Sequence, residues 1–180
     1  MNRSRLFKAL TPGLALCLAG CVSIPDTYAP PMERKPVTGF GTNSFGSIVG
    51  MGEPGARMHI IKDVSPVVEG GSWRWSGKRP ELRFIVTRTE NVKLVMDFAV
   101  AKATFDATGP VTFSFFVNDQ LLDKVRYDAP GDKHYEKPVP PEWLRTDQMS
   151  TIAVEIDKVQ VSPLDGAALG FILSRVGFAE

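Results

Sequence analysis

The stretch VTFSFFVNDQLLDKVRYD, residues 111–128, limits the possible folds more than any other part of the chain. Apolar and polar residues alternate over most of its first seven positions, and a period of two predicts a strand with one buried face. The pair Asn118-Asp119 predicts a tight turn, because both side chains tolerate a positive φ. Alternation resumes after the turn, so the segment is expected to form a β-hairpin.

Two registers fit this hairpin. A loop of two residues pairs Val117 with Gln120. A loop of three residues gives the pairs Val117–Leu121, Phe113–Val125 and Val111–Tyr127. We favour the second register, because a slip of one residue moves the whole apolar set to the other face. Phe116 breaks the alternation and is expected to lie under a loop or a neighbouring strand.

Other short runs with strand character lie between turn residues. They are Ser72–Ser76, Glu81–Arg88, Asn91–Val100, Lys133–Lys137, Thr151–Asp157 and Leu169–Phe178. The Gly77–Pro80 segment is expected to stop the first of these strands. The run at 57–64 fits a strand or a helical turn, and a helical turn from Pro141 is expected to place Trp143 and Leu144 as a plug over one end of the core.

Seven or eight short strands with frequent Gly and Pro, and no long helical pattern, predict an all-β domain over residues 57–180. The expected architecture is an antiparallel two-sheet sandwich or a barrel.

The first 21 residues have the three parts of a secretory signal, too short to span a membrane. Arg3, Arg5 and Lys8 precede an apolar run that ends in Leu18-Ala19-Gly20-Cys21. This ending resembles the lipobox of bacterial lipoproteins. The resemblance implies that residues 1–20 are removed and that Cys21 is acylated, which anchors the protein in a bilayer of the cell envelope. Val22 after the cysteine resembles the outer-membrane sorting pattern.

A Pro- and Gly-rich segment, residues 21–56, is expected to be a tether with a reach of roughly 30–35 Å if it is flexible. Its apolar part, Phe45–Met51, is expected to dock on the domain, because a free linker would leave these side chains poorly solvated.

Charge and cysteine content exclude several functions. The chain has 21 basic and 20 acidic residues, and without the three basic residues of the signal it carries about −2. This balance argues against a nucleic acid partner. Cys17 would leave with the signal and Cys21 would be acylated, so no cysteine nucleophile or cysteine metal site is expected. The sequence predicts no cofactor.

From residue 72 to 178 the motifs follow a familiar order. A WRW strand precedes a V-N-x-x-L-L hairpin, a polar strand, a Pro-rich turn with a short helix, an I-x-V-x-I strand and a closing LGF strand. This order resembles jelly-roll, galactose-binding-like β-sandwich domains similar to carbohydrate-binding modules. The resemblance implies an antiparallel two-sheet jelly roll and favours glycan binding, although this fold also serves protein-binding and structural roles.

Two groups of residues are candidates for ligand binding. Trp73 and Trp75 are two apart and share one face of a strand, with Arg74 on the other. Coplanar indoles would stack on a sugar ring, whereas large aromatic side chains more often pack into the core. Asp132, His134 and Glu136 share a face of the polar strand.

This second group fits a divalent cation or sugar hydroxyls, but it also fits the solvated face of an edge strand, which we favour. We therefore predict no metal site. His59 stands alone in an apolar run and is expected to be packed or exposed rather than catalytic.

Three functions remain. The first is a membrane-anchored, non-catalytic, carbohydrate-binding envelope lipoprotein. The second is a structural or assembly lipoprotein that binds an envelope protein. The third, an enzyme acting on polysaccharide, is disfavoured because the sequence has no G-x-S-x-G motif or paired-carboxylate spacing.

Overall fold

The computed structural model describes residues 45–163 and 166–180, which form one folded body. The predicted signal, Cys21 and most of the predicted tether lie outside the described residues, as do two residues of the loop at 163–166. Within the described residues, no helix has the length and apolarity needed to cross a bilayer.

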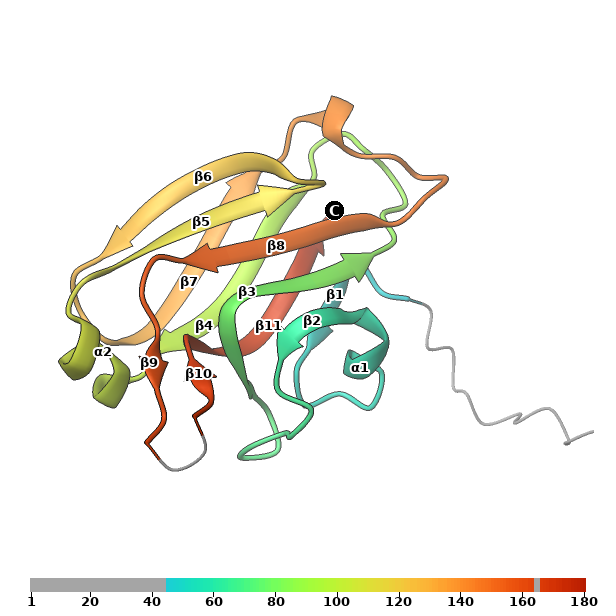
Figure 1. Cartoon of the computed structure of the whole chain (residues 1–180). Coiled ribbons are helices and arrows are strands. Elements are labelled where there is room, and N and C mark those ends of the chain that lie inside the picture. The colour runs from blue at the N-terminus through green and yellow to red at the C-terminus, as the bar shows by residue number, and fades with distance from the viewer. Residues whose placement is uncertain (1–44, 164–165) are drawn as a thin grey trace, which may run out of the picture. The chain divides into compact units, whose positions relative to one another are not determined.

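Strands make up most of this body, so the all-β prediction is confirmed (Figure 1). In chain order the elements are β1 (Ile48–Gly50), α1 (Ala56–His59), β2 (Ile60–Val64), β3 (Arg74–Phe84), β4 (Lys93–Val100), α2 (Lys102–Thr108), β5 (Val111–Val117), β6 (Gln120–Tyr127), β7 (Gly131–Pro138), the 3₁₀ helix η1 (Pro141–Trp143), β8 (Ser150–Ile156), β9 (Gln160–Val161), β10 (Ala168–Leu169) and β11 (Phe171–Ala179).

The strands form one curled antiparallel sheet in the order β6-β5-β8-β3-β11-β4-β7. β1 adds to β11, β2 adds to β3, and β9 and β10 form a separate pair. Figure 1 shows β5, β6 and β8 crossing in front of β4, β7 and β11. The structure therefore has two facing halves joined by a continuous hydrogen-bonded path, where the sequence predicts two sheets.

The long strand β3 joins the two halves because it changes partner along its length. Its first residues, Arg74–Ser76, pair with β11, and its last residues, Glu81–Phe84, pair with β8. The predicted stop at Gly77–Pro80 is wrong, since these residues are the bend within one strand. Bends of this kind let a strand pass from one layer to another.

The bend in β3 is held by Asp63 of β2. Asp63 has a φ of 59°, and its Oδ2 accepts a hydrogen bond of 2.5 Å from the backbone N–H of Arg79. A Cβ at Gly77 would lie 2.1 Å from Asp63 Oδ1, so only glycine leaves room for this carboxylate. The glycine that looks like a strand breaker in the sequence is thus required for the bend.

Aromatic side chains fill the space between the two halves. Phe113 of β5 contacts Phe98 of β4 and Phe171 of β11, with ring centroids 4.8 and 5.0 Å apart. Tyr135 of β7 stacks on Phe115 of β5 at 3.6 Å. This burial raises the pKa of the Tyr135 hydroxyl, with a smaller contribution from nearby Asp123. The core is a single apolar cluster of side chains from both halves.

The β5–β6 hairpin combines both registers considered from the sequence. Asn118 and Asp119 form a two-residue turn with φ of 48° and 62°, and Val117 pairs with Gln120, so the predicted Val117–Leu121 pair is wrong. Beyond a β-bulge at Leu122, the pairs Phe113–Val125 and Val111–Tyr127 form as predicted. Phe116 lies beneath the Arg79 guanidinium, 4.8 Å from its ring centroid.

The predicted docking of Phe45–Met51 is confirmed for its central residues. Residues 48–50 pair with β11 as β1, and Val49 and Met51 are buried. The ambiguous run at 57–64 is divided between α1 and β2, and η1 begins at Pro141 as predicted, with Leu144 buried.

Helix α2 has no counterpart in the prediction, because its seven residues lack a side-chain cap at the N-terminus. At its C-terminal end, the Lys158 ammonium donates hydrogen bonds to the carbonyls of Thr108 and Pro110.

Candidate functional site

A cavity of about 480 Å³ opens beside the first residues of β3. One wall comes from the end of β2 and the loop that follows it, and consists of residues 63–67 and 69. The base is Trp75–Gly77 of β3, and the opposite wall is residues 167–169, which include β10. The Gly170 N–H donates to the Ser76 carbonyl at 2.8 Å, which fixes the second wall against β3. We refer to this cavity as the Trp75 groove.

A tight turn before β3 sets the direction in which the strand leaves the loop. Gly70 and Gly71 have φ of 56° and 71°, values that glycine adopts without strain. The turn is closed by hydrogen bonds between the backbones of Glu69 and Trp73. A Cβ at Gly70 would lie 2.9 Å from Trp73 Nε1, so the Trp73 indole packs directly on this turn.

The two tryptophans differ in their relation to the groove. Trp75 lines it and is half-buried, whereas Trp73 is absent from the lining. Their rings are 6.0 Å apart and nearly perpendicular, at 83°. The coplanar pair considered from the sequence is therefore wrong. One indole is presented to the groove, and the second supports it through an edge contact.

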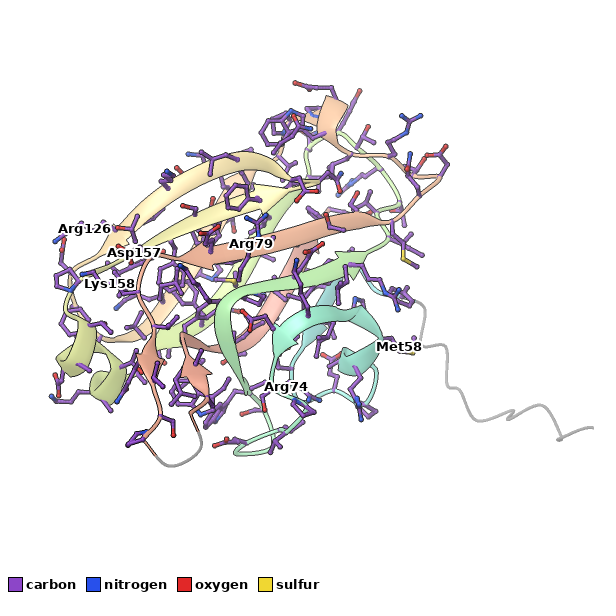
Figure 2. All side chains as sticks on the ribbon, in the orientation of Figure 1. Met58, Arg74, Arg79, Arg126, Asp157 and Lys158 are labelled. Carbon is purple, nitrogen blue, oxygen red and sulfur yellow. The ribbon has the colours of Figure 1, made fainter. Side chains whose placement is uncertain are left out.

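Arg74 points to the opposite side of β3 and is buried, at 4% exposure. Its Nε donates to the Met51 carbonyl at 3.0 Å, and its Nη1 donates to the carbonyls of Ser65 and Pro66 at 3.1 and 2.6 Å. Burial lowers the pKa of the guanidinium. Figure 2 shows Arg74 at the lower end of β3, and Arg79 near the middle of the sheet. In place of the predicted ligand contact, Arg74 holds the loop that walls the groove.

Polar residues line the groove beside the half-buried Trp75 indole. Ser65 Oγ accepts a hydrogen bond from the Val67 N–H. Ser76 is buried on the side of β3 that carries Arg74, and its Oγ donates to the Phe171 carbonyl at 2.7 Å. Asp63 is engaged at the β3 bend, whereas Glu69 enters no ion pair among the described residues. The groove thus combines one half-buried indole with Asp63, Ser65 and Glu69 in its lining, which suits a polar ligand with an apolar face.

The second predicted group lies elsewhere, on the exposed face of the edge strand β7. His134 Nδ1 lies 2.5 Å from Asp97 Oδ1, and Asp97 Oδ2 pairs with Arg175 at 3.0 Å. Glu136 pairs with Lys93 at 2.6 Å, and this hydrogen bond lowers the pKa of the Glu136 carboxyl.

Asp132 takes no part in this network, although it lines a hollow of about 550 Å³ next to His134. No group of three or more His, Cys, Asp or Glu that could hold a metal occurs within residues 45–163 and 166–180. The three residues share an exposed strand face, as the sequence predicts, and His134 and Glu136 are both engaged by neighbouring side chains.

His59 is buried between the rings of Phe45 and Phe84. Its Nδ1 donates to the Arg83 carbonyl at 2.9 Å, and burial lowers the pKa of the imidazole. The side chain therefore holds α1 against β3, which agrees with the packed role considered from the sequence.

Comparisons with known proteins add little to this geometry. No protein-family model and no curated protein matches the chain. One similar solved structure is described as a novel family GH115 4-O-methyl-α-glucuronidase, BtGH115A, with specificity for decorated arabinogalactans. It is 10% identical with a TM-score of 0.40, and the match covers 66% of this chain but only 16% of the other. A likeness at this level transfers neither fold nor function.

Proposed function

We propose that this chain is a cell-envelope lipoprotein whose β domain is a non-catalytic, carbohydrate-binding module. The observation that carries the proposal is the Trp75 groove, in which one half-buried indole shares the lining with Asp63, Ser65 and Glu69. Its volume of about 480 Å³ is typical of cavities that take small ligands. A sugar ring matches this lining, since its C–H face is apolar and its edge carries hydroxyls.

The environment of the carboxylates favours binding over hydrolysis. A glycosidase needs two carboxyl groups free to act on either side of the scissile bond. Of the two that line the groove, Asp63 is held by the backbone of Arg79 at the β3 bend. We therefore expect the purified protein to leave a bound glycan intact.

The anchor is the second part of the proposal. Leu18-Ala19-Gly20-Cys21 supports acylation of Cys21, and Val22 supports the outer membrane as its location. Several acyl chains, at about 0.8 kcal/mol for each buried methylene, would hold the protein on the bilayer. The two facing halves of the curled sheet support the jelly-roll assignment, which remains part of this proposal.

A glycan microarray tests binding directly. The wild-type protein should bind a subset of glycans. Trp75→Ala should lose this signal, because it removes the only tryptophan in the groove lining. Trp73→Phe is the matched control and should keep it, since Trp73 is absent from the lining and phenylalanine retains an aromatic contact. Equal binding by wild type and Trp75→Ala would refute the assignment of the groove.

Membrane attachment is tested separately. Cys21→Ser should move the protein from the membrane fraction to the soluble fraction and abolish incorporation of labelled fatty acid. If the variant stayed lipid-labelled, Cys21 would not be the acylated residue.

A protein partner is the second candidate function, and exposed apolar side chains support it. Val67 and Val68, in the loop that walls the groove, are 58% and 37% exposed, and Val161 of β9 is 63% exposed. A protein partner could cover these exposed apolar side chains, because contiguous exposed apolar surface often marks a protein interface. Crosslinking in membranes from a crosslinker placed at Val67 should then trap one dominant protein, and a diffuse set of products would count against this function.

A further inference from the structure

The charged side chains that line the Trp75 groove are all acidic. Asp63 and Glu69 lie in its wall, and among the described residues of the lining none is Lys, Arg or His. A groove lined by charges of one sign concentrates ligands of the opposite sign and repels ligands of the same sign. The lining therefore limits the charge of the sugar, which the proposed function leaves open.

Glu69 is the carboxylate in this lining that is free to meet a ligand. The residue is half-buried, yet its side chain enters no hydrogen bond or ion pair within residues 45–163 and 166–180. Its backbone is bonded to Ser72 and Trp73 in the turn before β3, which fixes where the side chain starts. Partial burial without a partner is unfavourable for a carboxylate, and a cation in the groove would remove that cost.

Asp63 adds a second negative charge at a fixed position. Its Oδ2 accepts the backbone N–H of Arg79 at 2.5 Å. An amide carries no net charge, so this hydrogen bond holds the carboxylate in place and leaves its charge unpaired. Asp63 would thus attract a cation in the groove from a distance, whereas Glu69 can contact it.

The basic side chains near this wall do not reach into the groove. Arg74 lies on the opposite side of β3, and its Nε and Nη1 donate to three backbone carbonyls. Its charge weakens the negative potential, but the two carboxylates outnumber it. Lys62 and Lys78 are exposed and lie outside the lining. An anionic sugar would therefore find no side chain in the described lining to pair with.

An indole next to a carboxylate suits a cation that has an apolar face. The face of a tryptophan ring attracts cations, and a carboxylate forms charge-assisted hydrogen bonds with an ammonium group. A uronate would bring a like charge towards Asp63 and Glu69. A neutral sugar would use the indole but leave Glu69 without a partner. A sugar with a free amino group, which is protonated near neutral pH, satisfies both Trp75 and Glu69.

We propose that the Trp75 groove takes an amino sugar with a protonated amine, whose ring packs on Trp75 and whose ammonium group pairs with Glu69. The inference rests on the proposed function for the sugar and adds its charge. The protein would then distinguish deacetylated from acetylated hexosamine residues in a glycan, and it would exclude uronates.

The indole N–H of Trp75 reports on the groove in ¹⁵N NMR spectra, and a Trp75→Phe spectrum identifies its signal among the three tryptophans of the chain. The sample is the full chain carrying Cys21→Ser. It is titrated with glucosamine, N-acetylglucosamine, glucose and glucuronate, which differ in the charge on a similar ring. Methylammonium is the probe for a cation without a sugar ring.

Glucosamine should bind about fivefold more tightly than glucose or N-acetylglucosamine, the effect of one ion pair in a partly exposed site, and glucuronate should bind most weakly. Glu69→Gln should reduce the affinity for glucosamine to that for glucose. Raising the ionic strength should weaken the binding of glucosamine but not of glucose.

Glu142→Gln is the matched control and should bind as the wild type does. It makes the same change in net charge at an exposed position of η1, which Figure 1 shows at the upper end of the body, whereas β10 of the groove lies at the lower end. Glu69→Gln should fold as the wild type does, because only the backbone of Glu69 bonds to the turn.

If neutral sugars shift the Trp75 signal and glucosamine binds no more tightly than they do, this inference is overturned and the proposed function stands. If no sugar shifts the signal, both are overturned. Equal affinity of Glu69→Gln and the wild type for glucosamine would overturn the inference, and so would methylammonium binding as tightly as glucosamine.

Discussion

Replacing Arg74 with methionine separates a structural role for this residue from a role in ligand binding. Methionine keeps much of the apolar stem but has no hydrogen-bond donor. The carbonyls of Met51, Ser65 and Pro66 would each lose the guanidinium. If these bonds hold the groove loop, Arg74→Met should lower the free energy of unfolding before any ligand is added.

The magnitude follows from the burial of each bond. The bond to Met51 is buried and the two to the loop are partly buried. A hydrogen bond from a charged donor contributes about 1.5–3 kcal/mol when buried, and less where water replaces it. Burying the guanidinium charge is itself unfavourable, so removing it offsets part of the free energy lost with these hydrogen bonds. We therefore expect a net loss of about 3 kcal/mol, which lowers Tm by roughly 10 °C.

Urea unfolding followed by circular dichroism measures this change. Arg126→Met is the matched control, since Arg126 pairs with Asp128 and its side chain is 63% exposed. An exposed pair of this kind contributes less than about 1 kcal/mol, so the control should stay close to the wild type. Equal stability of Arg74→Met and Arg126→Met would refute the role of Arg74 in holding the loop.

Three further predictions concern the rest of the fold. Gly77→Ala should cost more than about 2 kcal/mol, because its Cβ would lie 2.1 Å from Asp63 Oδ1, and Asp63→Gly should recover part of that loss. If the free-energy costs of Gly77→Ala and Asp63→Gly were strictly additive in the double mutant, the close approach of residues 63 and 77 at the bend would be contradicted.

Burial lowers the pKa of His59 in the folded state, so between that pKa and about 6.5 the unfolded chain binds more protons and the free energy of unfolding falls as the pH falls. Urea unfolding at several pH values should show a smaller fall in His59→Phe, and identical pH profiles would contradict it. Asn118→Ala should destabilise the hairpin by about 1–2 kcal/mol, since alanine disfavours the φ of 48° and lacks both hydrogen bonds; an unchanged Tm would count against this role.

Local patterns in the sequence predict most of the strands, but not the way in which they are joined. Alternation locates β4, β5 and β8, and the pair Asn118-Asp119 gives the hairpin turn. No pattern in the sequence predicts the bulge at Leu122. The register of the three-residue loop is therefore wrong at the turn but correct beyond the bulge. The β3 bend is hidden for a similar reason: Gly77 looks like a breaker until Asp63 is placed beside it.

The candidate sites are less visible from the sequence, because they are assembled from distant segments. The sequence marks Trp75 as a candidate, but the groove also needs the loop at 64–69 and β10 at 168–169, which only the folded chain brings together. Arg74 carries no sign in the sequence that its partners are backbone carbonyls.

Isothermal titration of the best array glycan into wild type and Trp75→Ala tests the central claim most directly. If the indole covers about 80 Å² of a sugar face, at about 25 cal/mol per Å² it contributes about 2 kcal/mol, or about thirtyfold in affinity. The account predicts a wild-type Kd in the micromolar to millimolar range and a loss of at least tenfold in the variant. An unchanged Kd in a folded Trp75→Ala protein, or no heat with any array glycan, would contradict it.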